Sequence, residues 1–224
     1  FIIEDACEAV GGAYQGKPCG SFGRCSAFAF YPNKQMTTGE GGALLTDDAA
    51  LAEEARSLRN QGRGSQEVAY EHVRLGYNYR IDELSAALGC SQEARLDEML
   101  ARRAQVARWY HHRLRKLPGL GLLEEPQGCT RSWFVYVVRL TEGTSRERVI
   151  GQLKQKGIES RGYFQPIHLF PFYRELLGHR PGDFPVTERL AKRSVSLPMY
   201  PELTAGQVDH VATQVLGFFK GRRK

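Results

Sequence analysis

The chain has no apolar run of the length that a membrane helix needs, which is about 20 residues. It also lacks paired metal ligands. Its 224 residues include five cysteines, without a C-x-x-C pair and without the Cys/His spacing of a zinc site. We therefore expect no membrane association and no metal. The odd number of cysteines fits reduced thiols, and hence a cytoplasmic protein.

Two phosphate-binding signatures are missing as well. The pattern G-x-x-x-x-G-K-[ST] of a P-loop does not occur, and the glycines at 39–42 lead into a predicted strand rather than a helix. The formal net charge of +6 arises partly from a C-terminal tail that contains Lys220, Arg222, Arg223 and Lys224. No basic face with aromatic partners accompanies this tail, so we expect a solvated end and no nucleic-acid partner.

The composition, with 42% hydrophobic and 25% charged residues, is that of a globular protein with one large domain or two small ones. Short apolar runs predict strands at residues 1–4, 27–31 and 43–46. Asp47 or Asp48 can cap a helix that has Leu51 and Leu58 on one face. The chain opens on F-I-I-E-D without a methionine, as if inside a buried strand, so we expect a missing upstream segment.

Beyond this region the pattern becomes helical. Leucines spaced by multiples of four predict a long helix that starts near Asp82 and continues, with a bend, to Lys116. Further elements are then expected, namely a strand at 133–140, a helix at 145–156 and a strand at 158–164. Thr204 and Gln207 form a capping-box pattern that opens a final helix. We place a domain boundary in the long helix near residue 112.

The most informative segment is Y-P-N-K-Q-M-T-T-G-E-G-G, at residues 31–42. It lies between two predicted strands, so Lys34 is expected on a loop that a rigid scaffold holds. A lysine beside glycines can bind a phosphate through its charge, or it can form a covalent bond with an aldehyde. The simpler alternative is a glycine-rich hairpin with a surface lysine, and spacing alone leaves all three open.

Asp5 favours the covalent alternative. It follows an apolar strand, where the functional groups of α/β sheets gather. Pyridoxal phosphate needs both an amine and a carboxylate, because it acts as an electron sink only while its ring nitrogen stays protonated. The alternative role for Asp5 is the N-cap of a helix over residues 6–10.

Seven motifs together resemble the DegT/DnrJ/EryC1/StrS family of pyridoxal phosphate-dependent sugar aminotransferases. They lie in the family's order at residues 4–9 (E-D-A-C-E-A), 20–23 (G-S-F-G), 27–34 (A-F-A-F-Y-P-N-K), 38–42 (T-G-E-G-G), 76–82 (G-Y-N-Y-R-I-D), 157–168 and 197–201 (L-P-M-Y-P). The similarity extends to about residue 216. It implies an α/β protein of aminotransferase fold type I, with part of the large domain at 1–112 and a C-terminal α+β small domain at 113–224.

The resemblance also implies roles for single residues. Lys34 would be the catalytic residue that binds the cofactor aldehyde and moves protons. Asp5 would bind the pyridine nitrogen, while Glu8 matches a position near the cofactor's phenolic oxygen. A carboxylate suits that position only when it is protonated or turned away. Asn78 would reach the cofactor phosphate of a neighbouring subunit, which implies a homodimer with shared active sites; its alternative is a turn residue.

Two further residues are expected near the substrate. Arg80 would face the subunit interface or the substrate, or would pair with Asp82 or Glu83. His168 would lie near the sugar nucleotide, although a lone histidine is often a structural residue. Ala29 stands where the family often has a serine that binds the cofactor phosphate, and it cannot donate that hydrogen bond.

The implied reaction transfers an amino group from an amino acid, glutamate or glutamine, to a keto group of a nucleotide-linked deoxysugar. A sugar dehydratase of the same fold is an alternative, but that branch replaces the lysine and Lys34 is present. A non-catalytic regulatory protein is another. Because family members are longer, we expect this chain to be the C-terminal part of an enzyme and to be inactive by itself.

Overall fold

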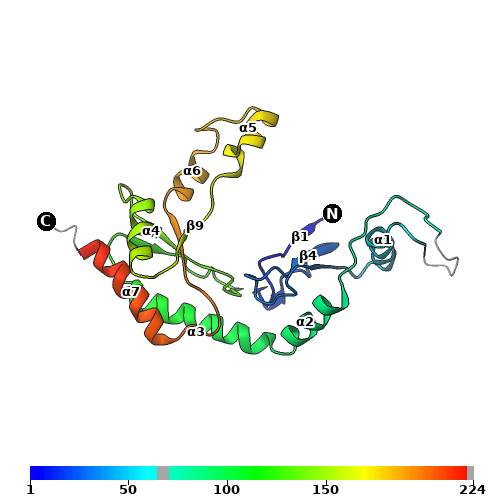
Figure 1. Cartoon of the computed structure of the whole chain (residues 1–224), viewed down its shortest axis with the longest axis horizontal. Coiled ribbons are helices and arrows are strands. Elements are labelled where there is room, and N and C mark those ends of the chain that lie inside the picture. Colours follow the sequence, from blue (N-terminus) through cyan, green and yellow to red (C-terminus); the bar gives the residue numbers. More distant parts are fainter. Residues whose placement is uncertain (65–70, 221–224) are drawn as a thin grey trace. The chain divides into compact units, whose positions relative to one another are not determined.

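The computed structural model describes residues 1–64 and 71–220, which form two compact units (Figure 1). The first unit contains Phe1–Ala101 and Glu125–Phe134, and the second contains Arg102–Glu124 and Val135–Lys224. This division differs from the boundary predicted near residue 112. The tail residues Arg222, Arg223 and Lys224 lie outside the described residues. So does Ser65, which ends a loop that the sequence predicts at residues 62–65.

A three-stranded sheet forms the scaffold of the first unit. Its strands are β1 (Ile3–Asp5), β4 (Cys25–Ala29) and β5 (Gly42–Leu45), in the order β1-β4-β5. Strand β1 runs parallel to β4, while β4 and β5 are antiparallel. The predicted pair of strands around the glycine-rich loop is therefore confirmed.

The expectation that residues 1–4 are buried is wrong for the described chain. Phe1 is 97% exposed and Ile3 is 63% exposed. The reason is that β1 is an edge strand, with β4 as its one neighbour among the described strands. Exposed apolar side chains therefore line this edge of the sheet.

A second, smaller sheet explains why residues 125–134 belong to the first unit. Strand β2 (Ala13–Tyr14) pairs with β3 (Lys17–Pro18) on one side and with β7 (Cys129–Thr130) on the other. The register places Tyr14 opposite Cys129. Because each strand has two residues, no alternation of apolar residues could announce it in the sequence.

Two helices of this region each start after a capping aspartate, of which Asp48 is one of the two caps that the sequence suggests. The Asp48 carboxylate accepts hydrogen bonds from the first amides of α1 (Ala49–Arg59), and Asp82 does the same for α2 (Glu83–Glu93). The single helix predicted from Asp82 to Lys116 is instead two helices. Helix α3 (Leu96–Leu114) begins after a break at 94–95, with two acidic residues in its first turn, where they complement the helix dipole.

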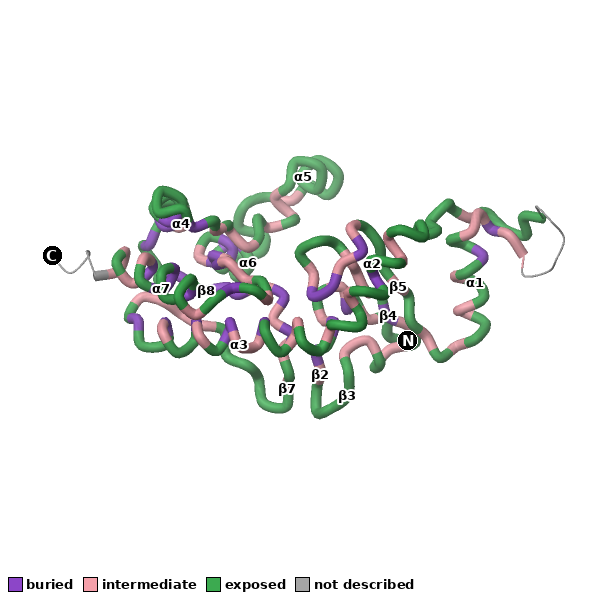
Figure 2. Tube along the Cα trace, turned by 60° about the horizontal axis from the view of Figure 1, so that its bottom comes forward, coloured by how far each residue is buried: buried purple, intermediate pink, exposed green. Residues whose placement is uncertain are grey.

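The second unit is built on an antiparallel sheet of order β6-β8-β10-β9. Its strands are β6 (Leu120–Leu122), β8 (Tyr136–Leu140), β9 (Arg161–Gly162) and β10 (Ser194–Leu197). The strands predicted at 133–140 and 158–164 are thus shorter than expected. Helices α3, α4 (Arg146–Gln155) and α7 (Ala205–Lys220), together with strands β8 and β10, contribute most of its buried residues (Figure 2).

A buried tyrosine in the core of this unit is hydrogen-bonded to the L-P-M-Y-P motif. Tyr110 of α3 is fully buried and stacks on Tyr136, with ring centroids 4.8 Å apart. Its hydroxyl donates to the main-chain oxygen of Pro198 at 3.0 Å, inside the L-P-M-Y-P motif. Burial raises the pKa of the Tyr110 hydroxyl, so it remains a donor.

The capping box before α7 is confirmed. The Gln207 side chain accepts from the Thr204 amide at 2.8 Å, and the Thr204 hydroxyl accepts from the Gln207 amide at 3.3 Å. Three short helices were not predicted, namely η1 (Ile167–Leu169), α5 (Pro171–Leu177) and α6 (Pro185–Ala191). Throughout residues 1–64 and 71–220, no helix combines the length and apolarity needed to cross a membrane.

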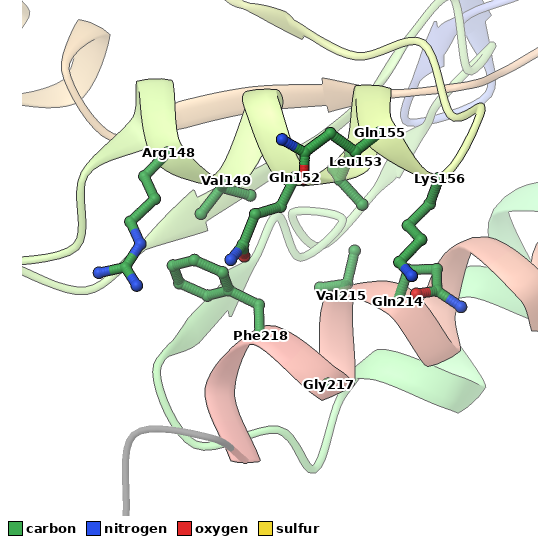
Figure 3. A pocket seen from close by; sticks show the side chains of 10 residues that line it. All are labelled: Arg148, Val149, Gln152, Leu153, Gln155, Lys156, Gln214, Val215, Gly217 and Phe218. Atoms are coloured by element: carbon green, nitrogen blue, oxygen red, sulfur yellow. The ribbon is translucent and has the colours of Figure 1, made fainter.

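A cavity of about 320 Å³ lies between α4 and α7 (Figure 3). Val149, Leu153 and Val215 provide apolar walls, and Arg148 and Lys156 add positive charge. Its lining contains no carboxylate, histidine or cysteine. Lys156 is therefore the one lining side chain of a type that takes part in acid–base or nucleophilic chemistry, and it has no acidic or histidine partner in this lining.

Candidate active site

The loop that carries Lys34 is held by hydrogen bonds between its two ends. The Phe30 amide donates to the Gly41 oxygen at 2.9 Å, and the Thr38 amide returns to the Phe30 oxygen at 2.9 Å. Gln35 and Thr38 are buried, at 1% and 4% exposure. The loop is therefore a packed structure, as expected for a functional loop between two strands, rather than a surface hairpin.

One glycine of the loop and one glycine of helix α2 allow close contacts with Thr38. Gly41 has φ +154°, and a Cβ there would lie 2.4 Å from the Thr38 hydroxyl. Helix α2 approaches from outside, because a Cβ on Gly89 would meet the Thr38 methyl at 2.9 Å. The position of Lys34 thus depends on close contacts that only glycine permits.

Asp5 ends β1, next to the strand that leads to Lys34. Its carboxylate accepts a hydrogen bond from the Cys7 amide at 3.2 Å. The Cys7 thiol, the Cys7 amide and the positive charge of Lys34 lower the pKa of Asp5. Residues 6–10 form turns and no helix, so Asp5 is not a helix cap. It is a carboxylate that stays ionised close to an amine.

Glu8 and Lys34 form an ion pair. The Lys34 amine lies 3.0 Å from Glu8 Oε1, and the Lys34 side chain is 13% exposed. The same amine lies over the ring of Phe134, 4.3 Å from its centroid. The structure therefore brings Asp5, Glu8 and Lys34 together, and it adds an aromatic residue that sequence analysis missed.

Gln35 connects these parts. Its amide nitrogen donates to the main-chain oxygen of Glu8 and to the Ser132 hydroxyl, both at 2.7 Å. Ser132 and Phe134 lie about a hundred positions after the lysine and were assigned to the second domain. No sequence signal connected them with Lys34, because their proximity depends on the pairing of β7 with β2.

The motif G-S-F-G is held by Glu4. The carboxylate of Glu4 accepts from the Gly20 and Gly23 amides, each at 2.7 Å, and from the Phe22 amide. Burial opposes the charge, but these three hydrogen bonds outweigh it and lower the pKa of Glu4. Glu4 therefore fixes the loop beside β1, a role that sequence analysis did not foresee.

Asn78 and Arg80 are placed by the end of α1. Asn78 forms a β-bridge with Asn60, and the Arg80 guanidinium donates to the Asn60 side chain at 2.9 Å. The alternative of Arg80 pairing with Asp82 or Glu83 is thus not the arrangement observed. Both residues are exposed, which leaves them accessible to a ligand or to another subunit.

The same segment continues towards the Lys34 loop. The Ile81 side chain would lie 3.2 Å from a Cβ at Gly41. Residues 78–81 therefore run from the end of α1 to the glycine turn. This is the path by which the G-Y-N-Y-R-I-D motif reaches the site.

His168 lies in the second unit and has a structural partner. Its Nε2 is 3.1 Å from Glu188 Oε1, and both side chains are nearly buried, at 9% and 11% exposure. The Gly182 amide also donates to Glu188 at 2.7 Å. The Gly182 amide and His168 lower the pKa of Glu188, which favours its ionised form. The structural alternative describes this histidine, and a role in substrate binding stays a prediction.

Comparison with known protein families identifies the family of this chain. The profile of the DegT/DnrJ/EryC1/StrS aminotransferase family matches residues 1–216. The chain belongs to this family. The predicted family and fold are therefore confirmed.

GDP-perosamine synthase of Caulobacter vibrioides is 40% identical over 215 residues, which are 94% of this chain and 57% of that protein. The structure of S. venezuelae DesV in complex with a ketimine intermediate matches with a TM-score of 0.88 at 34% identity, covering 98% of this chain and 58% of DesV.

The PLP-form of the putative sugar aminotransferase Spr1654 from Streptococcus pneumoniae matches with a TM-score of 0.91 at 25% identity, covering 98% of this chain and 58% of that one. The chain thus spans somewhat more than half the length of these relatives. Pyridoxal phosphate is the cofactor that the family and these structures indicate.

The donor set of the site fits this cofactor. An ionised carboxylate at a strand end can hold a protonated ring nitrogen, and Asp5 is such a group. Lys34 supplies a primary amine whose charge acts on Asp5. Within the described part of the chain, no cluster of histidine, cysteine and acidic side chains could hold a metal ion.

Proposed function

We propose that the protein transfers an amino group from an amino acid, glutamate or glutamine, to a keto group of a nucleotide-linked deoxysugar. The observation that carries this proposal is the placement of the ionised Asp5 near the amine of Lys34. When bound, pyridoxal phosphate supplies an aldehyde that accepts the amino group and a ring that stabilises negative charge on the substrate carbon.

The residues of the chain have distinct tasks in this proposal. Asp5 holds the proton on the ring nitrogen. Lys34 would hold the cofactor aldehyde and, once its amine is released, would move the proton between the cofactor carbon and the substrate carbon, as a positioned amine can. Glu8 lies beside Lys34 and would lie near the cofactor's phenolic oxygen. Its ion pair with Lys34 compensates the charge that makes a carboxylate unfavourable there.

The remaining residues act on the rest of the cofactor and on the substrate. Asn78 binds the cofactor phosphate of a neighbouring subunit, which makes the protein a homodimer with shared active sites. Arg80, whose charge is exposed next to Asn78, attracts the nucleotide diphosphate. His168 would contact the sugar once its pair with Glu188 opens.

Visible absorption tests the proposal, and it is recorded on the longer enzyme of which this chain is expected to be the C-terminal part. Added pyridoxal phosphate should produce a band from the Lys34-bound cofactor, and this band should be absent in Lys34→Ala. Glutamate should then bleach the band, and a nucleotide-linked keto sugar should restore it. A protein without a Lys34-dependent band is not a catalyst of this kind. A band that resists every amino donor would favour the non-catalytic alternative.

A further inference from the structure

Lys34 is held between two groups of opposite character. The Glu8 carboxylate lies 3.0 Å from its amine, and the face of the Phe134 ring lies 4.3 Å from it. We propose that Phe134 is a positioning residue for Lys34, and that its ring keeps the amine beside Glu8 before the cofactor binds. The consequence for cofactor capture rests on the proposed function, but the contact itself does not.

The chemistry of lysine explains why such a residue is needed. Its amine sits on a flexible four-carbon stem, so one ion pair leaves several rotamers open. An aromatic face attracts a cation and excludes water from one side of it. With Glu8 and Phe134 in place, the Lys34 side chain is 13% exposed, although it carries a charge.

Both groups are tied to the residue that follows the lysine. The buried Gln35 amide nitrogen donates to the Glu8 main-chain oxygen and to the Ser132 hydroxyl, two positions before Phe134. Gln35 therefore links the anionic and the aromatic side of Lys34 through one side chain. Displacing either side strains the same pair of hydrogen bonds.

The position of Phe134 does not depend on Lys34. Strand β7 (Cys129–Thr130) pairs with β2, which anchors the segment that leads to the ring. Phe134 itself is 9% exposed. The ring is thus a fixed surface on which the amine rests, which is what a positioning residue requires.

Magnetic resonance tests the contact without any cofactor. The ε-methylene protons of Lys34, assigned by their loss in Lys34→Arg, should be shifted upfield by the ring current of Phe134. The shift should vanish in Phe134→Leu, which keeps an apolar side chain, and should persist in Phe134→Tyr, which keeps the ring. Lys34 protons at the position of an exposed lysine in the unaltered protein would overturn the proposal.

A matched control exists in the same unit. Lys17 lies over the ring of Phe22, 4.7 Å from its centroid. Phe22→Leu should remove the ring current from Lys17 and leave the Lys34 signal unchanged. A change at Lys34 in this control would mean that any aromatic loss disturbs the unit, and would overturn the specific role of Phe134.

The second measurement is the rate at which the visible band of Lys34-bound cofactor grows. In Phe134→Leu the Lys34 side chain loses the ring that orients it. We therefore expect this variant to bind the cofactor covalently about threefold to tenfold more slowly. Phe134→Tyr and Phe22→Leu should capture at the unaltered rate. Capture at the unaltered rate in Phe134→Leu would refute the positioning role.

The two proposals fail in different ways. If the unaltered protein forms no band, the proposed function fails, while the ring-current shift still decides whether Phe134 orients Lys34. Thermal unfolding of each variant shows whether it has lost its structure. If Phe134→Leu does not fold, the test uses Phe134→Tyr instead. A Tyr variant that folds but loses the shift would contradict the proposal.

Discussion

The Lys34 amine and the Glu8 carboxylate lie 3.0 Å apart, and Glu8 is half exposed. A pair of this kind contributes little to folding, because water solvates the carboxylate in both states. Glu8→Gln should therefore lower the free energy of unfolding by less than about 1 kcal/mol. Denaturant titration would measure it. A loss several times larger would show that the pair holds the loop together.

Asp5 should be needed for the cofactor and not for the fold. Asp5→Asn keeps the shape of the side chain but removes the charge that retains the ring proton. We expect cofactor binding to weaken about tenfold to hundredfold, the range for a lost charged hydrogen bond. Equilibrium titration by absorbance measures this affinity.

Asp82→Asn is the matched control for Asp5→Asn. It changes another ionised aspartate, which caps α2 through the Ser85 amide at 2.9 Å. Its cofactor affinity should be unchanged. Equal losses in both variants would contradict the specific role of Asp5.

Glu4 should make the protein sensitive to acid. The pKa of Glu4 lies below its usual 4.5 in the folded state, since three amides donate to the carboxylate against the cost of burial. Its stabilising effect is therefore complete above the unfolded pKa and is lost as the pH falls through the folded one. Unfolding measured from pH 6 down to pH 3 (roughly one to two units either side of that pKa) should show this slope. Glu4→Gln should make this pH dependence weaker. A pH dependence that persists unchanged in Glu4→Gln would mean that other carboxylates cause it.

Gly41 and Gly39 provide a matched pair of substitutions. Both have positive φ, but a Cβ on Gly41 would lie 2.4 Å from the Thr38 hydroxyl, while one on Gly39 meets nothing within 4 Å. Gly39→Ala should cost about 1–2 kcal/mol of conformational strain. Gly41→Ala should cost clearly more and should also slow cofactor capture, because Lys34 shares this loop. Equal costs would mean that the loop relaxes around the new side chain.

Local signals allowed much of the fold to be predicted from the sequence. Asp48, Asp82 and Ser145 cap helices in the structure, as does the pair Thr204 and Gln207. Each of these caps depends on residues three positions apart, which a sequence displays directly. The prolines at the first turn of α5 and α6 are signals of the same kind that were overlooked.

The site was predicted in part. Asp5 and Glu8 follow strand β1, and Lys34 follows its neighbour β4. Their proximity could be predicted because motifs close together in the sequence carry all three residues. Phe134 could not be predicted from the sequence. Its contact with Lys34 depends on the pairing of strand β7 with β2, and a two-residue strand is too short to show a pattern in the sequence. The roles of Asp5, Glu8, Lys34, Asn78, Arg80 and His168 stay predictions. The presence of an upstream segment and the cytoplasmic location stay predictions too.

The backbone contact between Gly62 and Gly76 has a practical consequence. A Cβ on Gly76 would lie 2.2 Å from the Gly62 nitrogen, and Arg63 bridges to His72 just inside this contact. The close approach of these two glycines thus holds the start of the G-Y-N-Y-R-I-D motif against the end of α1. A side chain at either glycine would therefore push the two backbones apart and displace the motif that meets the Lys34 loop.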